Sequence, residues 1–438
     1  MARGKSKKAA KVLTPEEKLE QALVPAEEQP YRIPKNWTWI EFSNIASIRT
    51  GKKDANYGSA DGEYYFFTCA AEPIRCAGYS FDCKAILLAG NGDISNISIH
   101  EGKFEAYQRT YVVEIVEPVI VEFCYYYFKY RWVDYNKDKM FGTAIPYIRL
   151  GNLRRFPMPI APITEQQRIV DRIENIFAKL DEVKEKAQSV VDGFELRKSA
   201  ILHKAFTGEL TERWRKEHGV GLDSWKRLSI ASVCSSLKYG TAKKSEKTGN
   251  VVVIRMGNLQ QGEIDWTDLA YSNDMDDIKK YRLDVGDVLF NRTNSAALVG
   301  KTSIYRGEYP AIYAGYLIKL DYNHDIIIGD FLNYALNTNN AKEYCKSVKT
   351  DGVNQSNINA KKIGAYIISV PTIDEQTEIV AILQKLLAIE QQAKIAAESV
   401  IAQIDTMKKA VLSRAFRGEL GTNDPTEESA VELLKAVL

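Results

Sequence analysis

Hydrophobic residues recur with a spacing of four and then three in two long stretches of this chain. The pattern begins at Ile169 in the first stretch and at Ile379 in the second. A sustained average spacing of 3.5 residues predicts α-helices that pair along a narrow apolar seam, as in a coiled coil. The predicted seam contains Ile169, Ile173, Ile176, Leu180, Val183, Ala187, Val190 and Phe194, and then Ile379, Leu383, Leu386, Ala393, Ala397, Val400 and Ile404, with Glu390 as the polar exception.

The two stretches are copies of each other. Residues 163–210 begin I-T-E-Q-Q-R-I-V and end A-F-T-G-E-L, and residues 373–420 begin I-D-E-Q-T-E-I-V and end A-F-R-G-E-L. Ile373 follows Ile163 by 210 positions, and Leu420 follows Leu210 by the same interval, so no insertion or deletion separates the copies. This constant register is typical of an internal duplication. Two unrelated core helices, the alternative interpretation, would have no reason to share it.

Each copy also carries signals for the ends of a helix. Thr164 and Asp374 are favourable N-cap residues, while Gly208 and Gly418 stand where a left-handed C-cap favours glycine. We therefore expect two helices of about 43 residues, each roughly 64 Å long at the usual rise per residue. The simplest pairing is antiparallel about a pseudo-twofold axis, with one globular domain at each end of the helix pair.

The sequence before each helix is rich in apolar runs bounded by Gly, Asn and Asp, which are typical of strands. The aromatic run 121–132 is interpreted as a packed helix rather than a stacking platform, and 225–233 is interpreted as an echo of 39–47. The predicted fold class is α+β, with two mixed α/β domains joined by two long antiparallel coiled-coil helices. Strands are predicted at 37–48, 64–69, 85–88, 109–116, 251–256, 288–291 and 312–320, and further helices at 14–23, 329–336 and 340–348.

These patterns divide the chain into six segments. The predicted boundaries are 1–30 for an N-terminal tail and short helix, 31–160 for the first globular domain, 161–215 for the first long helix, 216–371 for the second globular domain, 372–421 for the second long helix and 422–438 for a short C-terminal helix.

Composition narrows the possible classes of protein. The 438 residues are 45% hydrophobic but include no apolar run long enough to span a membrane. The six cysteines form no C-x-x-C pair, which predicts reduced thiols in a cytoplasmic protein and no metal site. The net charge of +2 is low for a protein that grips a long DNA site alone. If DNA is the ligand, the basic surface must be local, or partner proteins must contribute to it.

We find no set of catalytic residues in the sequence. Val299-Gly-Lys-Thr302 resembles the end of a phosphate-binding loop, but Ser295 stands where that motif requires glycine. The four histidines are scattered, and no glycine-rich nucleotide fingerprint follows a strand. The sequence therefore predicts a chain that binds, while its partners catalyse.

The combined pattern resembles the specificity subunits of type I restriction-modification enzymes over essentially the whole chain. The motifs are the paired helix starts and ends, the run G-D-V-L-F-N-R-T-N at 286–294 and Q-S-N-I at 355–358. The resemblance implies two target-recognition domains, each reading one half of a bipartite, asymmetric site in double-stranded DNA. It also implies two modification (methyltransferase) subunits docked on the helices, joined by restriction (motor and nuclease) subunits. S-adenosylmethionine, ATP and magnesium are then expected on those partners and no cofactor on this chain.

Candidate DNA-binding residues follow from residue type and position. The loop after the first strand of each domain is basic, and Gly51 and Gly240 are interpreted as keeping these loops open for phosphate contacts. Base edges in the major groove favour Arg, Lys, Asn and Gln. The candidates are Arg49, Lys52, Lys53, Arg109, Tyr147 and Arg149 in the first domain, and Lys238, Lys243, Lys244, Asn291, Arg292, Asn294, Lys301, Asn354, Gln355 and Asn357 in the second.

Three alternatives remain open on sequence alone. One is a stand-alone enzyme with unrecognised motifs, and another is a coiled-coil scaffold without a nucleic-acid role. The third is a specificity subunit of a type II system whose cleavage and methylation subunits are fused. The DNA target sequence is not encoded in any recognisable pattern.

Overall fold

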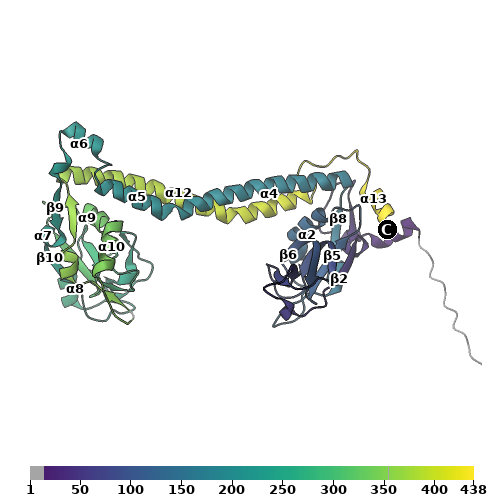
Figure 1. Cartoon of the computed structure of the whole chain (residues 1–438), viewed down its shortest axis with the longest axis horizontal. Helices are drawn as coiled ribbons and strands as arrows, with labels where there is room; N and C mark the ends of the chain where they lie inside the picture. Colours follow the sequence, from purple (N-terminus) through teal and green to yellow (C-terminus); the bar gives the residue numbers. More distant parts are fainter. Residues whose placement is uncertain (1–13, 354) are drawn as a thin grey trace, which may run out of the picture. The chain divides into compact units, whose positions relative to one another are not determined.

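A computed structural model describes residues 14–353 and 355–438. The chain divides into two compact units, each with its own core (Figure 1). Unit 1 contains the chain up to Lys186 together with Val400–Leu438, and unit 2 contains Ala187–Ser399. Both units are mixed α/β. Each also contains part of the two long helices, α4 (Ile163–Asp192) and α12 (Ile373–Ala415).

Unit 1 is built on a six-stranded sheet of order β2-β7-β5-β6-β3-β4. Its neighbours pair antiparallel except for β3 and β6, which are parallel. A separate pair, β1 and β8, leads into α4. The strands are β1 (Thr38–Glu41), β2 (Ala46–Thr50), β3 (Tyr64–Phe67), β4 (Ile74–Cys76), β5 (Phe81–Ala89), β6 (Ile97–Ala106), β7 (Thr110–Ile115) and β8 (Pro157–Ile160).

Helices cover the core of unit 1. The aromatic run forms helix α2 (Val121–Asn136), in which Phe128 and Trp132 are fully buried, so its interpretation as a packed helix is confirmed. The predicted N-terminal helix is α1 (Pro15–Ala22), and Thr14 and Glu17 form its capping box. The remaining helices are α3 (Leu150–Arg154) and α13 (Ala430–Val437).

Unit 2 has smaller sheets. The main ones are β10-β19-β15-β17 and β14-β11-β18, with the pair β22-β9 leading into α12. The predicted strand 312–320 is two strands, because the chain leaves one sheet after β18 and enters another at β19. The strands are β9 (Lys226–Ser229), β10 (Cys234–Tyr239), β11 (Val251–Ile254), β12 (Leu259–Gln260), β13 (Glu263–Ile264), β14 (Tyr271–Ser272), β15 (Val288–Asn291), β16 (Thr293–Asn294), β17 (Thr302–Ile304), β18 (Ala311–Tyr313), β19 (Leu317–Tyr322), β20 (Thr350–Asp351), β21 (Ser356–Asn357) and β22 (Ile367–Val370).

The two predicted helices of unit 2 are confirmed as α9 and α10. None of the helices in the described ranges combines the length and apolarity that a membrane crossing requires. The helices of unit 2, apart from α4 and α12, are α5 (Phe194–Phe206), α6 (Glu212–His218), α7 (Ile230–Val233), α8 (Met275–Tyr281), α9 (Gly329–Leu336), α10 (Asn339–Val348) and α11 (Ala360–Gly364).

The strand pair that leads into each long helix is the same in both units. The registers of β1 with β8 and of β9 with β22 place Lys226 where unit 1 has Thr38. Trp225 is therefore the counterpart of Trp37. The sequence comparison that matched Trp225 with Trp39 was wrong by two residues, because unit 1 has tryptophans at both 37 and 39 and only the strand register distinguishes them.

The repeated Glu-Gln at the start of each long helix ties the helix to its own unit. Glu165 and Glu375 are fully buried. The indole Nε1 of Trp37 donates to Glu165 at 2.7 Å, and that of Trp225 donates to Glu375 at 2.9 Å. A buried carboxylate needs such donors because it has lost its water. The motif is therefore a structural fastening that was duplicated with the helix.

The glutamine of the motif fastens a second element. Gln166 Oε1 accepts from the backbone N–H of Ile120 at 3.0 Å, and Gln376 Oε1 accepts from that of Ile328 at 3.0 Å. Ile120 and Ile328 are the N-cap residues of α2 and α9. Each glutamine thus satisfies a backbone donor at a helix start that has no side-chain cap of its own.

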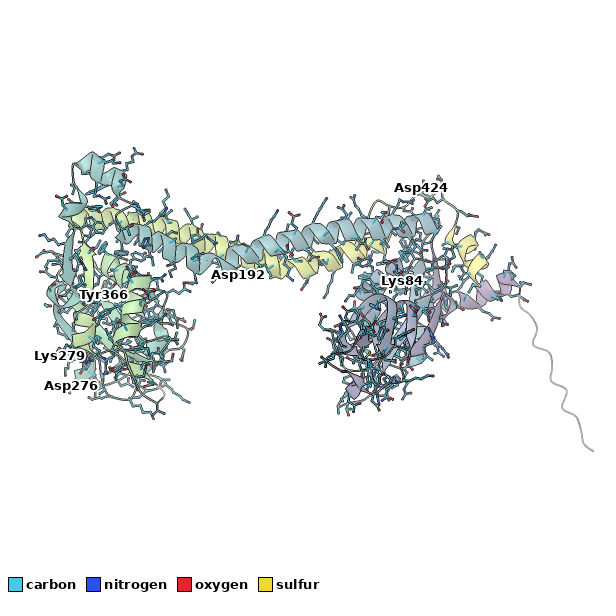
Figure 2. All side chains as sticks on the ribbon, viewed as in Figure 1. Lys84, Asp192, Asp276, Lys279, Tyr366 and Asp424 are labelled. Atoms are coloured by element: carbon cyan, nitrogen blue, oxygen red, sulfur yellow. The ribbon has the colours of Figure 1, made fainter. Side chains whose placement is uncertain are left out.

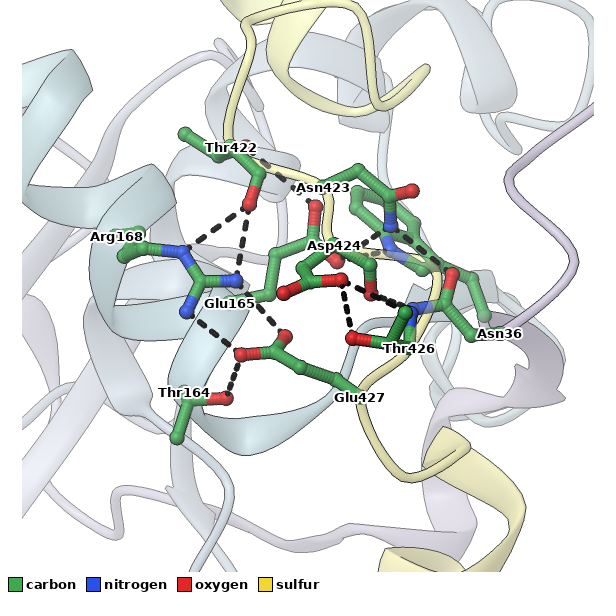
Figure 3. Close-up of polar contacts among 10 residues, drawn as sticks. Asn36, Thr164, Glu165, Arg168, Thr422, Asn423, Asp424, Thr426 and Glu427 are labelled. Carbon is green, nitrogen blue, oxygen red and sulfur yellow. Dashed lines mark hydrogen bonds and ion pairs between the residues drawn. The ribbon is translucent and has the colours of Figure 1, made fainter.

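The C-terminal segment of the chain completes the fastening in unit 1 (Figure 3). Asn423 Nδ2 donates to Glu165 at 2.8 Å, and Arg168 donates to both carboxylate oxygens of Glu427 at 2.8 Å. In unit 2 the corresponding donors come from the segment after α5. Arg215 and Thr211 each donate to Glu375 at 2.7 Å.

The long helices run antiparallel within each unit. In unit 1, Asp181 of α4 pairs with Lys408 at 2.6 Å, while the earlier residue Arg168 contacts the later residue Thr422. In unit 2, Arg197 of α5 pairs with Glu390 of α12 at 2.7 Å. This contact explains why the seam tolerates one polar residue in the second copy.

The second copy is a single helix of 43 residues, as predicted, but the first copy is not. It is divided into α4 and α5 at Gly193. The position that corresponds to Gly193 in the second copy is Gln403. Glycine weakens a helix because its backbone has more freedom to lose on folding. The prediction of one uninterrupted first helix was therefore wrong.

The seam is buried at the same positions in both copies. Ile169, Ile173 and Ala187 are buried, and so are their counterparts Ile379, Leu383 and Ala397. Val183, however, is 44% exposed, and its counterpart Ala393 is exposed as well. These two positions do not belong to the buried seam, although they fit its spacing. The partly buried positions are Ile176, Leu180, Val190, Leu386, Glu390 and Val400, whereas Phe194 and Ile404 are buried.

The predicted caps are correct at one end only. Gly208 and Gly418 have left-handed backbones, with φ of 83° and 72°. The helices start at Ile163 and Ile373, however, so Thr164 and Asp374 lie inside the first turn. The Thr164 hydroxyl donates to Glu427 instead.

Candidate nucleic-acid interface

Loops from distant parts of the sequence meet at one end of unit 2. The backbone N–H of Thr241 donates to Tyr313 at 2.9 Å, and that of Gly315 donates to Thr241 at 2.7 Å. The N–H of Arg292 donates to Tyr316 at 2.9 Å. These bonds hold the loops around a cavity of about 590 Å³. We call its main polar and basic residues loop cluster 2: Thr241, Lys243, Lys244, Arg255, Arg292, Thr293, Tyr316 and Asn357.

Loop cluster 2 concentrates positive charge. The Arg292 guanidinium lies 4.8 Å from the centre of the Tyr239 ring, and its Nη1 donates to the Gly315 carbonyl at 3.2 Å. Its Nε is buried without a partner among the described residues, as is Nε of Arg255. Buried donors of this kind are normally paired. Arg255 also forms an ion pair with Asp268 at 2.8 Å, so Arg292 is the better candidate of the two for an acceptor-rich ligand such as a base edge or a phosphate.

The lysines of cluster 2 are placed differently. Lys243 forms an ion pair with Asp274 at 2.5 Å, and this hydrogen bond raises the pKa of Lys243 above its usual value. Lys244 is exposed. Asn357 Nδ2 donates to Thr293 at 2.8 Å, which directs the asparagine within the cluster.

The corresponding loops of unit 1 also meet at one end of its sheet. The N–H of Gly90 donates to Arg109 at 2.9 Å, and the N–H of Ile148 donates to Gly90 at 2.9 Å. Gln108 in turn donates to the Lys53 carbonyl at 2.9 Å. We call the polar and basic residues at or next to these contacts loop cluster 1: Lys52, Lys53, Asn91, Arg109, Tyr147 and Arg149.

Cluster 1 combines cations with aromatic rings. The Arg149 guanidinium lies 3.8 Å from the centre of the Phe141 ring, and the Lys53 ammonium lies 4.3 Å from that of Tyr57. Such stacking orients a cation without neutralising it. Arg109 is exposed. The two clusters therefore occupy equivalent ends of the two units but present different side chains.

Several predicted residues lie outside the clusters. Arg49 forms an ion pair with Glu114 within the sheet of unit 1. Lys238 pairs with Asp321 at 3.0 Å. Lys301 donates to Gln260 at 2.8 Å, and burial lowers its pKa below the usual value.

Other candidates lie in or beside the antiparallel strands β16 and β21. Asn291 is fully buried, so its side chain is not available at the surface, contrary to its selection from the sequence. Asn294 is half-buried and Gln355 is exposed. Asn354 lies outside the described residues.

Sequence reasoning missed Arg255, Tyr316 and Tyr239. Arg255 directly follows the apolar strand β11. A charged residue at the end of a buried strand is a usable signal of a loop site. The two tyrosines offered no signal in the sequence, because only the folded loops bring them beside Arg255 and Arg292.

Gly51 and Gly240 have a different role from the one predicted. A Cβ on Gly51 would lie 1.8 Å from the Ala106 carbonyl oxygen, and one on Gly240 would lie 2.2 Å from that of Tyr313. These glycines let two backbone segments cross closely. They make the loop bases compact rather than open.

Comparison with known proteins gives the context for this geometry. The family model described as the type I restriction modification DNA specificity domain matches residues 34–191 and again residues 223–399. Together these matches cover more than half of the chain. The chain belongs to this family. It is a DNA specificity subunit, the non-catalytic member of a type I restriction-modification system.

Relatives of this specificity subunit are similar along most of their length. The chain is 26% identical over 420 residues to the EcoDI specificity subunit of Escherichia coli, covering 89% of this chain and 90% of the relative. It is 22% identical over 420 residues to the MjaVIII specificity subunit of Methanocaldococcus jannaschii, covering 89% of this chain and 94% of that relative.

Solved structures share the fold. The HsdS subunit from Thermoanaerobacter tengcongensis superposes with a TM-score of 0.59 at 18% identity, over 90% of this chain and 99% of that chain. A chain from a study of complex assembly and conformational transition of the type I R-M system gives a TM-score of 0.65 at 19% identity, over 89% of this chain and all of that chain. At these identities the likeness supports the shared fold alone.

Proposed function

We propose that this specificity subunit reads a bipartite, asymmetric site in double-stranded DNA, one half with each unit. The observation that carries the proposal is the repeated placement of a basic loop cluster. Each cluster includes the basic loop that follows β2 in unit 1 or β10 in unit 2, yet the exposed side chains of the two clusters differ. A common scaffold with different loops is what two different half-sequences require.

Roles within the clusters follow from chemistry. Lys52, Lys53, Lys243 and Lys244 are assigned to phosphates, which position the protein on the duplex without specifying sequence. Arg292 is assigned to a base edge in the major groove, where arginine pairs well with guanine. Arg109, Tyr147, Arg149, Arg255 and Asn357 are assigned to direct or shape-based reading.

The long helices are assigned the roles of spacer and docking platform for two modification subunits, which restriction subunits then join. Exposed apolar residues on α12 support docking, since Ile389 is 53% exposed and Ile395 is 55% exposed. S-adenosylmethionine, ATP and magnesium belong to the partner subunits in this proposal. The complex acts on DNA in the cytoplasm.

Exchange of one recognition segment tests the proposal. Residues 31–159 are replaced by the matching segment of a relative, the complex is assembled with its modification subunits, and methylated adenines are mapped. We expect one half of the methylated site to change and the other half to stay. A folded chimera that changes both halves would contradict reading by separate units.

The spacer role has its own test. Seven residues inserted after Lys186 and after Ala396 preserve the heptad spacing and lengthen each helix by about 10 Å. That length corresponds to roughly three base pairs of duplex. We expect the same two half-sequences separated by two or three additional pairs. An active variant that keeps its original spacing would show that the helices do not set the distance.

A further inference from the structure

Unit 2 has an open groove that shares no lining residue with loop cluster 2. The groove has a volume of about 470 Å³ and lies between α5, the α9–α10 connection and β22. Its rim includes Leu196, which is 77% exposed, and Ile367, which is 51% exposed. Tyr366, labelled in Figure 2, forms part of its lining. Exposed leucine and isoleucine beside a groove of this size are typical of a binding surface.

The same location can be identified in unit 1 from matched contacts. Phe206 lies 5.0 Å from Phe331 in unit 2, and Phe416 lies 5.2 Å from Phe123 in unit 1, ring centre to ring centre. The N-cap residues of α9 and α2 are likewise bound by equivalent glutamines. The groove-lining residues Ala335 and Thr207 therefore correspond to Tyr127 and Arg417.

In unit 1 this location is filled by Tyr31 from the N-terminal segment. The Tyr31 ring centre lies 5.0 Å from that of Trp39 in β1, and the Arg417 guanidinium lies 5.3 Å from the same ring. Tyr31 also packs against the core cluster that contains Tyr127, as does Tyr130. Tyr31 of the same chain therefore occupies this location in unit 1, and we call it the aromatic plug.

Unit 2 lacks such a plug for two reasons. Tyr31 stands six residues before Trp37, and the residue six before Trp225 is Gly219, which has no side chain. The lining is also smaller, since Ala335 stands where unit 1 has Tyr127. The groove is therefore the empty counterpart of an occupied aromatic site.

We infer that the groove of unit 2 receives an aromatic side chain from one of the two modification subunits. Aromatic anchors contribute strongly to protein interfaces when they fill a pocket. The only charged carboxylate among the described lining residues is Glu343, so a lysine or arginine next to the aromatic residue would complement it. This inference rests on the proposed docking of modification subunits. It adds that the two are held differently, because unit 1 offers no open groove at the same place.

Substitution of an exposed groove residue tests the inference with little risk to folding. Ala200→Trp places an indole in the groove from an exposed position of α5. Leu196→Ser removes the apolar rim without adding bulk. Val285→Trp, at a position of unit 2 that is 73% exposed and outside the groove, is the matched control. Stoichiometry and affinity are measured by native mass spectrometry and titration with purified modification subunit.

We expect the wild type and Val285→Trp to bind two modification subunits with unequal affinities. Ala200→Trp should weaken one binding step at least tenfold and leave the other unchanged, and Leu196→Ser should weaken the same step several-fold. Unchanged binding by both groove variants would overturn the inference and leave the proposed function standing. If the groove variants bind both modification subunits normally but fail to bind a restriction subunit, the choice of partner would be overturned. If the wild type binds no modification subunit, the proposed function itself fails.

Discussion

The two units bury the same carboxylate in different surroundings. Glu165 and Glu375 are both fully buried, and each accepts an indole N–H. Glu375 also forms an ion pair with Arg215, whose side chain is 7% exposed. Glu165 has the neutral donor Asn423 instead. Burial raises the pKa of Glu165, and the hydrogen bonds from Trp37 and Asn423 act in the opposite direction.

The difference arises from where each unit obtains its last segment. In unit 2 the segment after α5 continues directly past Glu375 and contributes Arg215. In unit 1 the C-terminal segment of the chain returns to Glu165 and contributes Asn423 (Figure 3). Duplication preserved the carboxylate and the tryptophan, while the segments that surround them diverged. Glu375 is therefore held by a buried ion pair, and Glu165 by neutral hydrogen bonds.

Removing the charge of Glu165 or of Glu375 should produce the largest difference between the two units in the free energy of unfolding. Glu375→Gln leaves the buried Arg215 without a counter-charge, so we expect a loss of about 3–5 kcal/mol in the free energy of unfolding. Glu165→Gln keeps a polar acceptor among neutral donors, so we expect a loss of about 1 kcal/mol. Chemical denaturation of both variants measures the difference. The double variant Arg215→Met/Glu375→Gln should recover part of the loss, and equal losses for the two single variants would contradict this comparison.

Substitutions in the two loop clusters should each affect a different half of the DNA site. Arg292→Ala should relax one base position in the half-site read by unit 2, with a loss of about 1–3 kcal/mol in discrimination. Arg109→Ala should affect only the half-site read by unit 1. Mapping of methylated adenines shows both effects. Lys238→Ala is the control, because that lysine is held by Asp321 outside cluster 2. An altered unit 1 half-site in the Arg292 variant would argue against separate reading.

The two copies of the long helix should differ in their response to glycine. Gln403→Gly introduces into the second copy the residue that divides the first, and should destabilise the protein by about 1 kcal/mol. Gly193→Ala should have a smaller net effect, because a Cβ there would lie 2.5 Å from Nη1 of Arg197 and would displace that side chain. Thermal unfolding compares the two. A larger change from Gly193→Ala would mean that the Arg197–Glu390 contact depends on the break.

Acid should affect the C-terminal segment in two opposing steps. The pKa of Glu427 is lowered, chiefly by its hydrogen bond with Arg168, so its contribution is present above its usual pKa and is lost as the pH falls through its folded value. The raised pKa of Glu165 has the reverse sign, because folding then favours the protonated form. The Arg168–Glu427 ion pair is partly exposed. We therefore expect Glu427→Gln to lower the free energy of unfolding by at most about 1 kcal/mol at pH 7. The cost should shrink as the pH falls below the usual pKa of a glutamate and disappear below the lowered pKa of the folded state. Unfolding measured across this range checks it, and a cost independent of pH would contradict the assignment.

The sequence alone determined the duplication, the helical seam and the family. These features depend on local spacing: a period of 3.5 residues defines a helix face, and a constant interval of 210 residues identifies a copy, whatever surrounds it. The helix ends at Gly208 and Gly418 were predictable for the same reason, since a left-handed backbone favours glycine wherever it occurs.

Only the tertiary structure decided which of those residues perform each task. Val183 fits the seam spacing but is 44% exposed, because burial depends on a neighbour that the spacing does not describe. Asn291 looked like a DNA-binding residue until the sheet buried it, whereas Arg255 joined cluster 2 because folding brings β11 beside Arg292. The residues around Glu165 come from opposite ends of the chain. Contacts between residues so far apart in sequence leave no periodic signal, so packing alone determines them.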